Sequence, residues 1–289
     1  MLRVIYDYLF TLISFAGAIL TLILFQQKFF PLLDEQGTIG VLFLGVLTFV
    51  FLTYSMALKI IYSREAKYAR ALPLINEAFR RIHSLTNDEL KNKGLVMAVL
   101  ENCCSKISSV FTMITSTKCS VCIKVLVWEA EEVSKRPKCV TLVRDTTAIS
   151  VRDYSEKIKI NHWVTENTDF SYILENIGSP IGRYFFSNFL PFFREYKNTS
   201  FGIYKAPPRN KYLGNNRIYR YFRWTLPYKS TIVAPICPSI TRTRSKDNLV
   251  GFLCIDSPRL QAFKRKYDVD LLTGISDGLF RIISVVQKL

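Results

Sequence analysis

Two long uncharged stretches near the N-terminus constrain this chain more than any other feature. Residues 8–25 (YLFTLISFAGAILTLILF) are 18 residues without a charge, and residues 38–58 (TIGVLFLGVLTFVFLTYSMAL) are 21 more. A helix needs about 20 apolar residues to cross the hydrocarbon core of a bilayer. The sequence therefore predicts a two-helix transmembrane hairpin over residues 1–58.

Two other interpretations of these stretches are open. The first stretch has the place of a signal peptide, but a signal peptide ends in a small-residue cleavage site, whereas this stretch runs into FQQKFFPLLDE. The second has the length of a buried core helix. The hairpin is the better interpretation because both stretches are long and uncharged, and because the charges lie at their ends.

The orientation of the hairpin follows from the basic residues that flank it. The connector 26–37 carries a single Lys beside Asp34 and Glu35, whereas four basic residues follow the second stretch: Lys59, Arg64, Lys67 and Arg70. Arg3 flanks the first stretch on its N-terminal side. Since cytoplasmic flanks are rich in Lys and Arg, both termini are predicted to be cytoplasmic.

Seven cysteines follow the second stretch, on the predicted cytoplasmic side, where thiols stay reduced. Cys119 and Cys122 form a CxxC, but no second CxxC accompanies it, and His83 and His162 are the only histidines. The partner spacing of a zinc site is therefore missing, so we expect small buried hydrophobic residues and no metal or cofactor.

The rest of the chain changes from helical to strand-like periodicity. A helix is expected to continue beyond residue 58 and to stop near Pro73, because proline disfavours helix for the residue before it. Further helices are predicted at 74–85, 88–115, 167–175 (with Asn167 as its capping residue) and 268–288, and strands at 119–128, 139–149, 231–236 and 249–255. This order predicts an α+β domain with an antiparallel sheet backed by helices.

Four segments resemble the second half of a GAF domain in order and spacing: NTDFSYILENIGSPIGRYFFSNFL, LPYKSTIVAPI, LVGFLCIDSPRLQAF and DVDLLTGISDGLFRIISVV. The resemblance covers residues 88–289 and is clear from Asn167 onward. It leaves residues 59–87 as a juxtamembrane stalk helix and linker. It implies a GAF-like antiparallel sheet of five or six strands flanked by helices on one face, with a ligand pocket on the other.

The motifs of this resemblance are structural and do not name a ligand. GAF domains bind cyclic nucleotides, tetrapyrroles or other small ligands, or act as dimerisation modules. The Asn-Lys-Phe-Asp-Glu pattern of the cyclic-nucleotide-binding members is not visible, and no Cys-His pair suits attachment of a bilin. The sulfoxide-reducing members use a set of cysteines in and near the pocket, and no clear alignment joins that set to Cys119, Cys122 or Cys139, so the ligand stays open.

The formal charge of +16 is concentrated in one part of the chain, because residues 196–246 contain no Asp or Glu. Within it RIYRYFRW, residues 217–224, alternates Arg with aromatic residues. Arg binds phosphates in a bidentate way and aromatic rings stack on bases. The predicted ligand-binding residues are Arg217, Arg220, Arg223, Trp224, Tyr228, Arg242, Arg244 and Lys246.

Three other roles for this basic region stay open. Basic residues near a membrane are attracted to anionic lipid headgroups. They also form solvated faces that keep a protein soluble. In a strand, the aromatic residues would face the core and the arginines would face outward.

The motifs GxxxxGK[ST], HExxH and GxSxG are absent, so no catalytic residues are predicted and the chain is expected not to be an enzyme. The architecture resembles bacterial antiphage effectors in which a cytoplasmic domain controls two spans that permeabilise the inner membrane. It implies an inner-membrane homo-oligomer whose trigger is an anionic ligand or a nucleic acid in a partner complex. The alternative is a membrane-tethered GAF sensor that signals to a separate partner by dimerisation.

Overall fold

The computed structural model of the chain describes residues 35–128, 137–146, 162–179, 183–202, 221–238 and 245–288. The first predicted span, residues 8–25, lies outside these ranges, as does most of the Arg-rich region. Contacts between residues divide the chain into two compact units, Met1–Ala66 and Lys67–Leu289.

Helix α2 (Glu35–His83) contains the second predicted span as continuous helix. Seven large apolar side chains between Phe43 and Tyr54 are 48–66% exposed. Within the described ranges, α4 (Lys93–Thr115) is the one helix long and apolar enough to cross a membrane, and α2 adds a shorter apolar stretch, Gly45–Met56. Since ten residues of α4 are buried in the second unit, α4 is a core helix. Insertion of residues 38–58 in a bilayer stays a prediction.

The expected helix end near Pro73 is wrong, because α2 continues through Pro73 to His83. A proline inside a helix removes one backbone hydrogen bond and costs about 3 kcal/mol in isolation. Packing on both sides of Pro73 offsets that cost. Ala71 is buried before it, and Ala78, Phe79 and Ile82 are buried after it in the core of the second unit.

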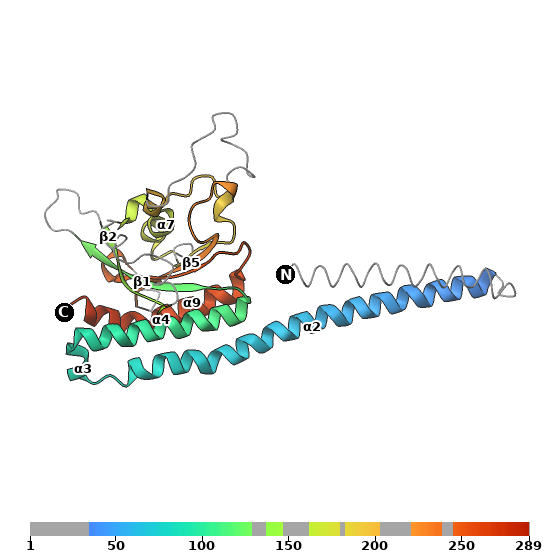
Figure 1. Cartoon of the computed structure of the whole chain (residues 1–289), viewed down its shortest axis with the longest axis horizontal. Helices are drawn as coiled ribbons and strands as arrows, with labels where there is room; N and C mark the ends of the chain where they lie inside the picture. The colour runs from blue at the N-terminus through green and yellow to red at the C-terminus, as the bar shows by residue number, and fades with distance from the viewer. Residues whose placement is uncertain are drawn as a thin grey trace, which may run out of the picture. The chain divides into compact units, whose positions relative to one another are not determined.

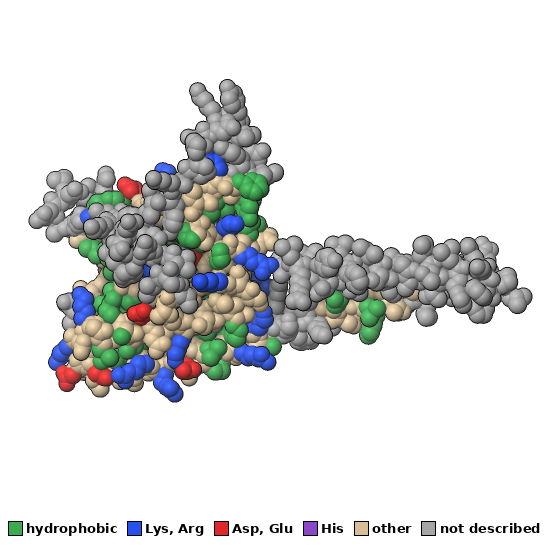
Figure 2. All heavy atoms as spheres, viewed as in Figure 1, with side chains coloured by type: hydrophobic (Ala, Val, Ile, Leu, Met, Phe, Trp, Pro, Cys, Tyr) green, Lys and Arg blue, Asp and Glu red, His purple; other side chains and the backbone are tan. Residues whose placement is uncertain are grey.

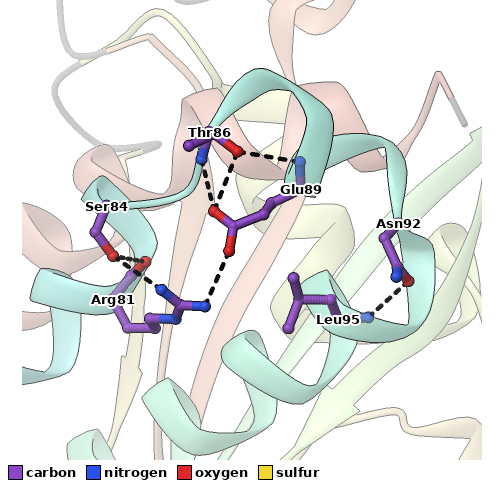
Figure 3. A network of polar contacts seen from close by, with 6 residues as sticks. All are labelled: Arg81, Ser84, Thr86, Glu89, Asn92 and Leu95. Atoms are coloured by element: carbon purple, nitrogen blue, oxygen red, sulfur yellow. Dashed lines mark hydrogen bonds and ion pairs between the residues drawn. The ribbon is translucent and has the colours of Figure 1, made fainter.

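A short helix, α3 (Asn87–Lys91), turns the chain from α2 into α4. Thr86 and Glu89 form a reciprocal capping box, in which the Glu89 carboxylate accepts the Thr86 backbone N–H at 2.9 Å (Figure 3). Arg81, from the last turn of α2, donates to the same carboxylate at 3.1 Å. The Asn92 side chain then caps α4 by accepting from the Leu95 N–H. These bonds satisfy backbone donors that helix starts leave free.

The described strands form one six-stranded antiparallel sheet in the order β3-β2-β1-β6-β5-β4 (Figure 1). The strands are β1 (Ser120–Trp128), β2 (Pro137–Arg144), β3 (His162–Trp163), β4 (Phe185–Ser187), β5 (Ser230–Ile236) and β6 (Gly251–Ser257). The predicted hairpin of residues 119–128 and 139–149 is confirmed as β1 paired with β2. The expected α+β class with an antiparallel sheet is confirmed for the second unit.

The two faces of the sheet carry different layers (Figure 1). Helices α4 and α9 (Arg265–Val286) pack against one face, and α7 (Thr168–Asn176) lies over the other. Alternation along β1 explains this division, since Val121, Ile123 and Val125 join the core beneath α4 and α9. The intervening residues of β1 therefore point to the α7 face.

Candidate functional site

A small cavity of about 50 Å³ lies on the α7 face of the sheet. Its lining comes from β1, β2, β3, β5 and β6, from α7, and from the segments before α7 and before β5. Most of these lining groups are polar or ionisable. The central strands of a sheet normally carry apolar side chains on both covered faces, so this polar lining marks the candidate site.

The register of the sheet brings the lining residues together. Cys122 of β1 lies opposite Arg144 of β2 and opposite Cys254 of β6. Asp256 of β6 lies opposite Thr231 of β5, whose hydroxyl donates to the carboxylate at 2.6 Å. Directly opposite residues have Cβ atoms about 4.5–5.5 Å apart. The floor of the cavity is therefore built from cross-strand neighbours.

Two cations line the cavity from β1 and β2. Lys124 is only 8% exposed, and its Nζ donates to the Thr141 hydroxyl at 3.0 Å. The Arg144 guanidinium donates to the same hydroxyl at 3.3 Å. Within the described ranges, neither Lys124 nor Arg144 has a carboxylate at ion-pair distance. An ammonium has three N–H donors, so this buried lysine keeps donors for a further acceptor.

Two carboxylates also line the cavity, Asp169 from α7 and Asp256 from β6. The pKa of Asp169 is raised to about 7, chiefly by burial and also by the negative charge of Asp256, against the opposing effects of the Phe170 backbone N–H and of Lys124. Asp169 accepts the backbone N–H of Phe170 at 3.0 Å and the Tyr196 hydroxyl at 3.4 Å. Near neutral pH it is thus partly protonated, and the two cations are only partly balanced.

His162 and Asn167 close the β3 side of the cavity. Burial, together with the nearby cations Lys124 and Arg144, lowers the pKa of His162 to about 3, so the ring is neutral. Asn167 stands at the N-cap position of α7, as predicted, but its side chain does not cap the helix. Its amide donates to the Trp163 carbonyl and accepts from Thr199. Asn167 therefore joins α7 to neighbouring segments instead.

A chain of hydrogen bonds connects the remaining wall. Asn198 Nδ2 donates to the Tyr196 hydroxyl at 3.2 Å and to the Tyr228 hydroxyl at 3.1 Å. The indole of Trp224 donates to the Tyr228 carbonyl at 2.6 Å and packs edge-on against Phe201. Tyr228 lines the cavity, whereas Trp224 lies outside the lining and contacts Tyr228 through this hydrogen bond.

The predicted ligand-binding residues fall in different places. Arg217, Arg220, Arg242 and Arg244 lie outside the described residues. Arg223 and Trp224 are half-buried shortly before β5, and Tyr228 lines the cavity there. Lys246 is exposed in the turn η6 (Lys246–Asn248), which leads into β6 at the opposite end of the β5–β6 pair. Seven strand residues span about 23 Å, so Lys246 and Tyr228 do not share a site.

Figure 2 shows no single patch of positive charge among the described residues of the face in view. On the face in Figure 2, Lys and Arg side chains are spread over the domain, with Asp and Glu scattered among them. Lys124 and Arg144 thus differ from the Lys and Arg side chains on this surface, because strands β1 and β2 hold them at fixed positions in the cavity wall.

Sequence reasoning missed Lys124, Arg144, Asp169 and Asp256. Lys124 could have been found from the sequence, because it is the only charge in the strand SVCIKVLVW. It also lies two residues after Cys122 and therefore on the same face of the strand. Asp256 is likewise the only charge in the strand GFLCIDS, one residue before its end. A charge inside an otherwise apolar strand indicates either an exposed face or a buried polar site. Only the packing of α7 decides between them.

No family model and no curated protein matches the chain. Solved structures similar to it include the GAF domain of a phosphoenolpyruvate-protein phosphotransferase from Acinetobacter, with a TM-score of 0.41 and 10% identity over 76% of this chain and 96% of that one. A type II free methionine-R-sulfoxide reductase from Thermoplasma acidophilum has a TM-score of 0.39 and 15% identity, over 68% of this chain and 95% of that one. The chromophore-binding domain of a bacteriophytochrome from R. palustris has a TM-score of 0.41 and 12% identity, over 76% of this chain and 62% of that one. These scores are too low to transfer a ligand or an activity to this chain.

Proposed function

We propose that the chain is a membrane-anchored sensor whose GAF-like domain binds a small anionic group in the cavity between Lys124 and Arg144. One observation carries this proposal. Lys124 is buried and bonds one hydroxyl, and that hydroxyl is shared with a second cation. Burying a charge is costly unless it is paired, so two adjacent cations on a cavity wall favour an anionic ligand.

The size of the cavity limits what can enter it. Pockets for drug-sized ligands measure about 300–1,000 Å³, whereas this cavity measures about 50 Å³. It has room for a carboxylate or a phosphate group but not for a base and a sugar. A nucleotide or nucleic-acid trigger would therefore enter only by its anionic group.

Membrane anchoring is supported by the exposed apolar side chains of α2. Phe43, Val50 and Phe51 are 66%, 59% and 65% exposed, which is costly in water and favourable in a bilayer. Together with the uncharged residues 8–25, this supports a two-span anchor, which we place in the bacterial inner membrane. The basic residues that follow residue 58 support an orientation with both termini cytoplasmic.

Two outputs are compatible with this anchor. In the effector form, ligand binding shifts the stalk part of α2 and changes the packing of the spans in a homo-oligomer, so that they permeabilise the membrane in antiphage defence. In the tethered-sensor form, the domain passes its signal to a separate partner protein by dimerisation. The small residues Gly40 and Gly45 favour close helix association and hence the effector form.

Anion binding by the full chain in detergent tests the proposal. We expect inorganic phosphate or acetate to bind in isothermal titration, and Lys124→Met to weaken binding about tenfold to hundredfold. A hydrogen bond to a charged group contributes about 1.5–3 kcal/mol, and methionine keeps the length of the lysine side chain. The matched control is Lys118→Met, an exposed lysine just before β1. Failure of both anions to bind, or wild-type affinity in Lys124→Met, would contradict the proposal.

The Arg-rich segment RIYRYFRW, residues 217–224, requires a separate measurement. If it adds a second contact to the anion, replacing Arg217, Arg220 and Arg223 by Glu weakens phosphate binding and removes part of its salt dependence. If the segment is only a surface, the affinity and its salt dependence stay at the wild-type values.

A further inference from the structure

Two cysteines of the cavity floor are direct cross-strand partners. Cys122 of β1 and Cys254 of β6 lie opposite each other, and both line the cavity with exposures of 4% and 5%. On the other side of Cys122, in the same row across the sheet, stands Arg144. The row therefore places a guanidinium, a thiol and a second thiol side by side.

This pair differs from the other thiols of the chain. All seven cysteines are free and buried, but Cys103, Cys104 and Cys119 belong to the core beneath α4 and α9. Cys119 and Cys122 of the CxxC thus lie on opposite faces of the sheet. Cys139 shares the α7 face with Cys122 and Cys254 but does not line the cavity. Among the described lining residues, the only thiols are those of Cys122 and Cys254.

The surroundings of the pair favour one thiolate and one thiol. A hydrogen bond from Cys254 lowers the pKa of Cys122 below its usual range, against the opposing effect of burial, and the charges of Arg144 and Lys124 lower it further. Burial and the neighbouring Cys122 raise the pKa of Cys254 well above its usual range. By contrast, burial raises the pKa values of Cys103 and Cys119 to about 12. The thiolate is the reactive form of cysteine, so reactivity is concentrated at Cys122.

We propose that Cys122 and Cys254 are a peroxide-reactive dithiol, in which Cys122 attacks a small hydroperoxide in the cavity and Cys254 resolves the product to a disulfide. The cavity volume of about 50 Å³ admits hydrogen peroxide. Lys124 and Arg144 offer donors to the departing oxygen. This inference does not rest on the anion-binding proposal, although both use the same cavity.

The chemistry balances with hydrogen peroxide as the only oxidant. The Cys122 sulfur attacks one peroxide oxygen, the S–O bond forms, the O–O bond breaks, and the departing hydroxide takes a proton to become water. The Cys254 sulfur then attacks the Cys122 sulfur, so that the S–S bond forms and the S–O bond breaks. This hydroxide leaves as water with the proton of the Cys254 thiol. Two thiols lose two electrons, and the peroxide becomes two waters.

The backbone geometry accommodates the disulfide. Opposite residues of antiparallel strands have Cα atoms about 4.5 or 5.5 Å apart. Disulfides form at Cα separations of about 4.4–6.8 Å. Either kind of cross-strand pair therefore lies within the range, and oxidation requires no change of register between β1 and β6.

Oxidation of the wild-type full chain in detergent provides the primary test. The reduced protein receives one equivalent of hydrogen peroxide, the remaining thiols are alkylated, and peptide mass spectrometry follows each cysteine over time. We expect Cys122 and Cys254 to be lost together into one disulfide, at least about tenfold faster than any other cysteine, and to return with dithiothreitol. Equal rates for all seven cysteines, or oxidation without the Cys122–Cys254 disulfide, would overturn the proposal.

Variants separate the two roles. Cys254→Ser should stop the reaction at a Cys122 sulfenic acid that dimedone traps, whereas Cys122→Ser should abolish the rapid phase. Cys139→Ser is the matched control, with a thiol on the same face outside the cavity, and it should react as wild type. A rapid phase that persists in Cys122→Ser contradicts the assignment.

Phosphate binding measured on the same wild-type preparation distinguishes the two proposals. Rapid oxidation without phosphate binding leaves the dithiol standing and overturns the anion site. Phosphate binding without selective oxidation supports the anion site and overturns the dithiol.

Discussion

Asp169 and His162 are two buried titratable groups whose effects on stability oppose each other. The pKa of Asp169 is raised to about 7, so its contribution to stability is fully present below about pH 4 and is lost as the pH rises to about 7. The pKa of His162 is lowered to about 3, so its contribution is present above about pH 6.5 and is lost as the pH falls. Between pH 4 and 6.5 the pH dependence of stability that comes from Asp169 and the one that comes from His162 have opposite signs, so they cancel in the wild-type chain.

Single substitutions should expose each slope. In Asp169→Asn only the His162 slope remains, so the melting temperature relative to wild type should fall as the pH is lowered from 6.5 to 4. In His162→Asn it should rise over the same interval. Each proton changes the stability by at most about 1.4 kcal/mol per pH unit, which corresponds to about 3–6 °C in a domain of this size. Thermal unfolding of the full chain in detergent, followed by tryptophan fluorescence, measures both slopes.

The double substitution provides the control for this pair. Asp169→Asn combined with His162→Asn should restore the wild-type pH profile, because the two opposing contributions are then removed together. Slopes of the same sign in the two single variants would contradict the opposing assignments.

Close packing of strands β1 and β6 depends on Gly251. A Cβ added there would lie 2.1 Å from the Lys124 carbonyl oxygen and 3.1 Å from the Val125 Cα, both of which are backbone atoms. Gly251→Ala should therefore separate the two strands and lower the free energy of unfolding by about 3 kcal/mol or more.

Gly274, in the interior of α9, is the matched control, since a Cβ there meets no atom within 4 Å. Gly274→Ala should raise the free energy of unfolding by about 0.5–1 kcal/mol, because alanine favours helix over glycine. Thermal unfolding of both variants tests the pair. A Gly251→Ala variant as stable as wild type would contradict the register of β1 and β6.

Element positions followed from periodicity wherever one face of the element is buried. The hairpin β1–β2 and the helices α7 and α9 lie close to their predicted residues because alternation or helical spacing records which face is covered. The strands β5 and β6 are buried at every residue, and they were predicted instead as short continuous apolar runs. The end of α2 could not be predicted, since tertiary packing of Ala78 and Phe79 overrides the local effect of Pro73. The two-residue strand β3 is too short to show a period.

The candidate site was less predictable than the fold. The predicted ligand-binding residues lie where positive charge is dense in the sequence, whereas the cavity is lined by isolated charges within apolar strands. Lys124 and Arg144 meet only because β1 pairs with β2 across a shift of register between Ile123 and Lys124. Asp169 joins them only because α7 covers that face of the sheet. Both facts depend on pairing between distant segments, which one sequence does not record.

At the scale of the whole molecule, polar bonds hold α2 to the domain at Lys67 and Tyr68. The Tyr68 hydroxyl donates to Asp268 Oδ1 of α9 at 2.8 Å, and Lys67 Nζ donates to the Ser116 hydroxyl at the end of α4 at 2.6 Å. Asp268 is 1% exposed and also accepts the Lys264 backbone N–H. Since the same helix contains residues 38–58, these bonds are where the proposed effector form would couple the domain to the predicted span.

Loss of the Tyr68 bond should therefore discriminate the two outputs in living bacterial cells. A hydrogen bond to a buried carboxylate contributes about 1–3 kcal/mol, so Tyr68→Phe would shift a two-state equilibrium of α2 about fivefold to 150-fold. In the effector form, Tyr68→Phe should depolarise the membrane and stop growth at lower induction than wild type. Tyr267→Phe is the matched control, because its ring packs 5.3 Å from that of Tyr68 and is 46% exposed. If neither wild type nor Tyr68→Phe depolarises cells at matched expression, the spans only anchor the domain, and the tethered-sensor form holds.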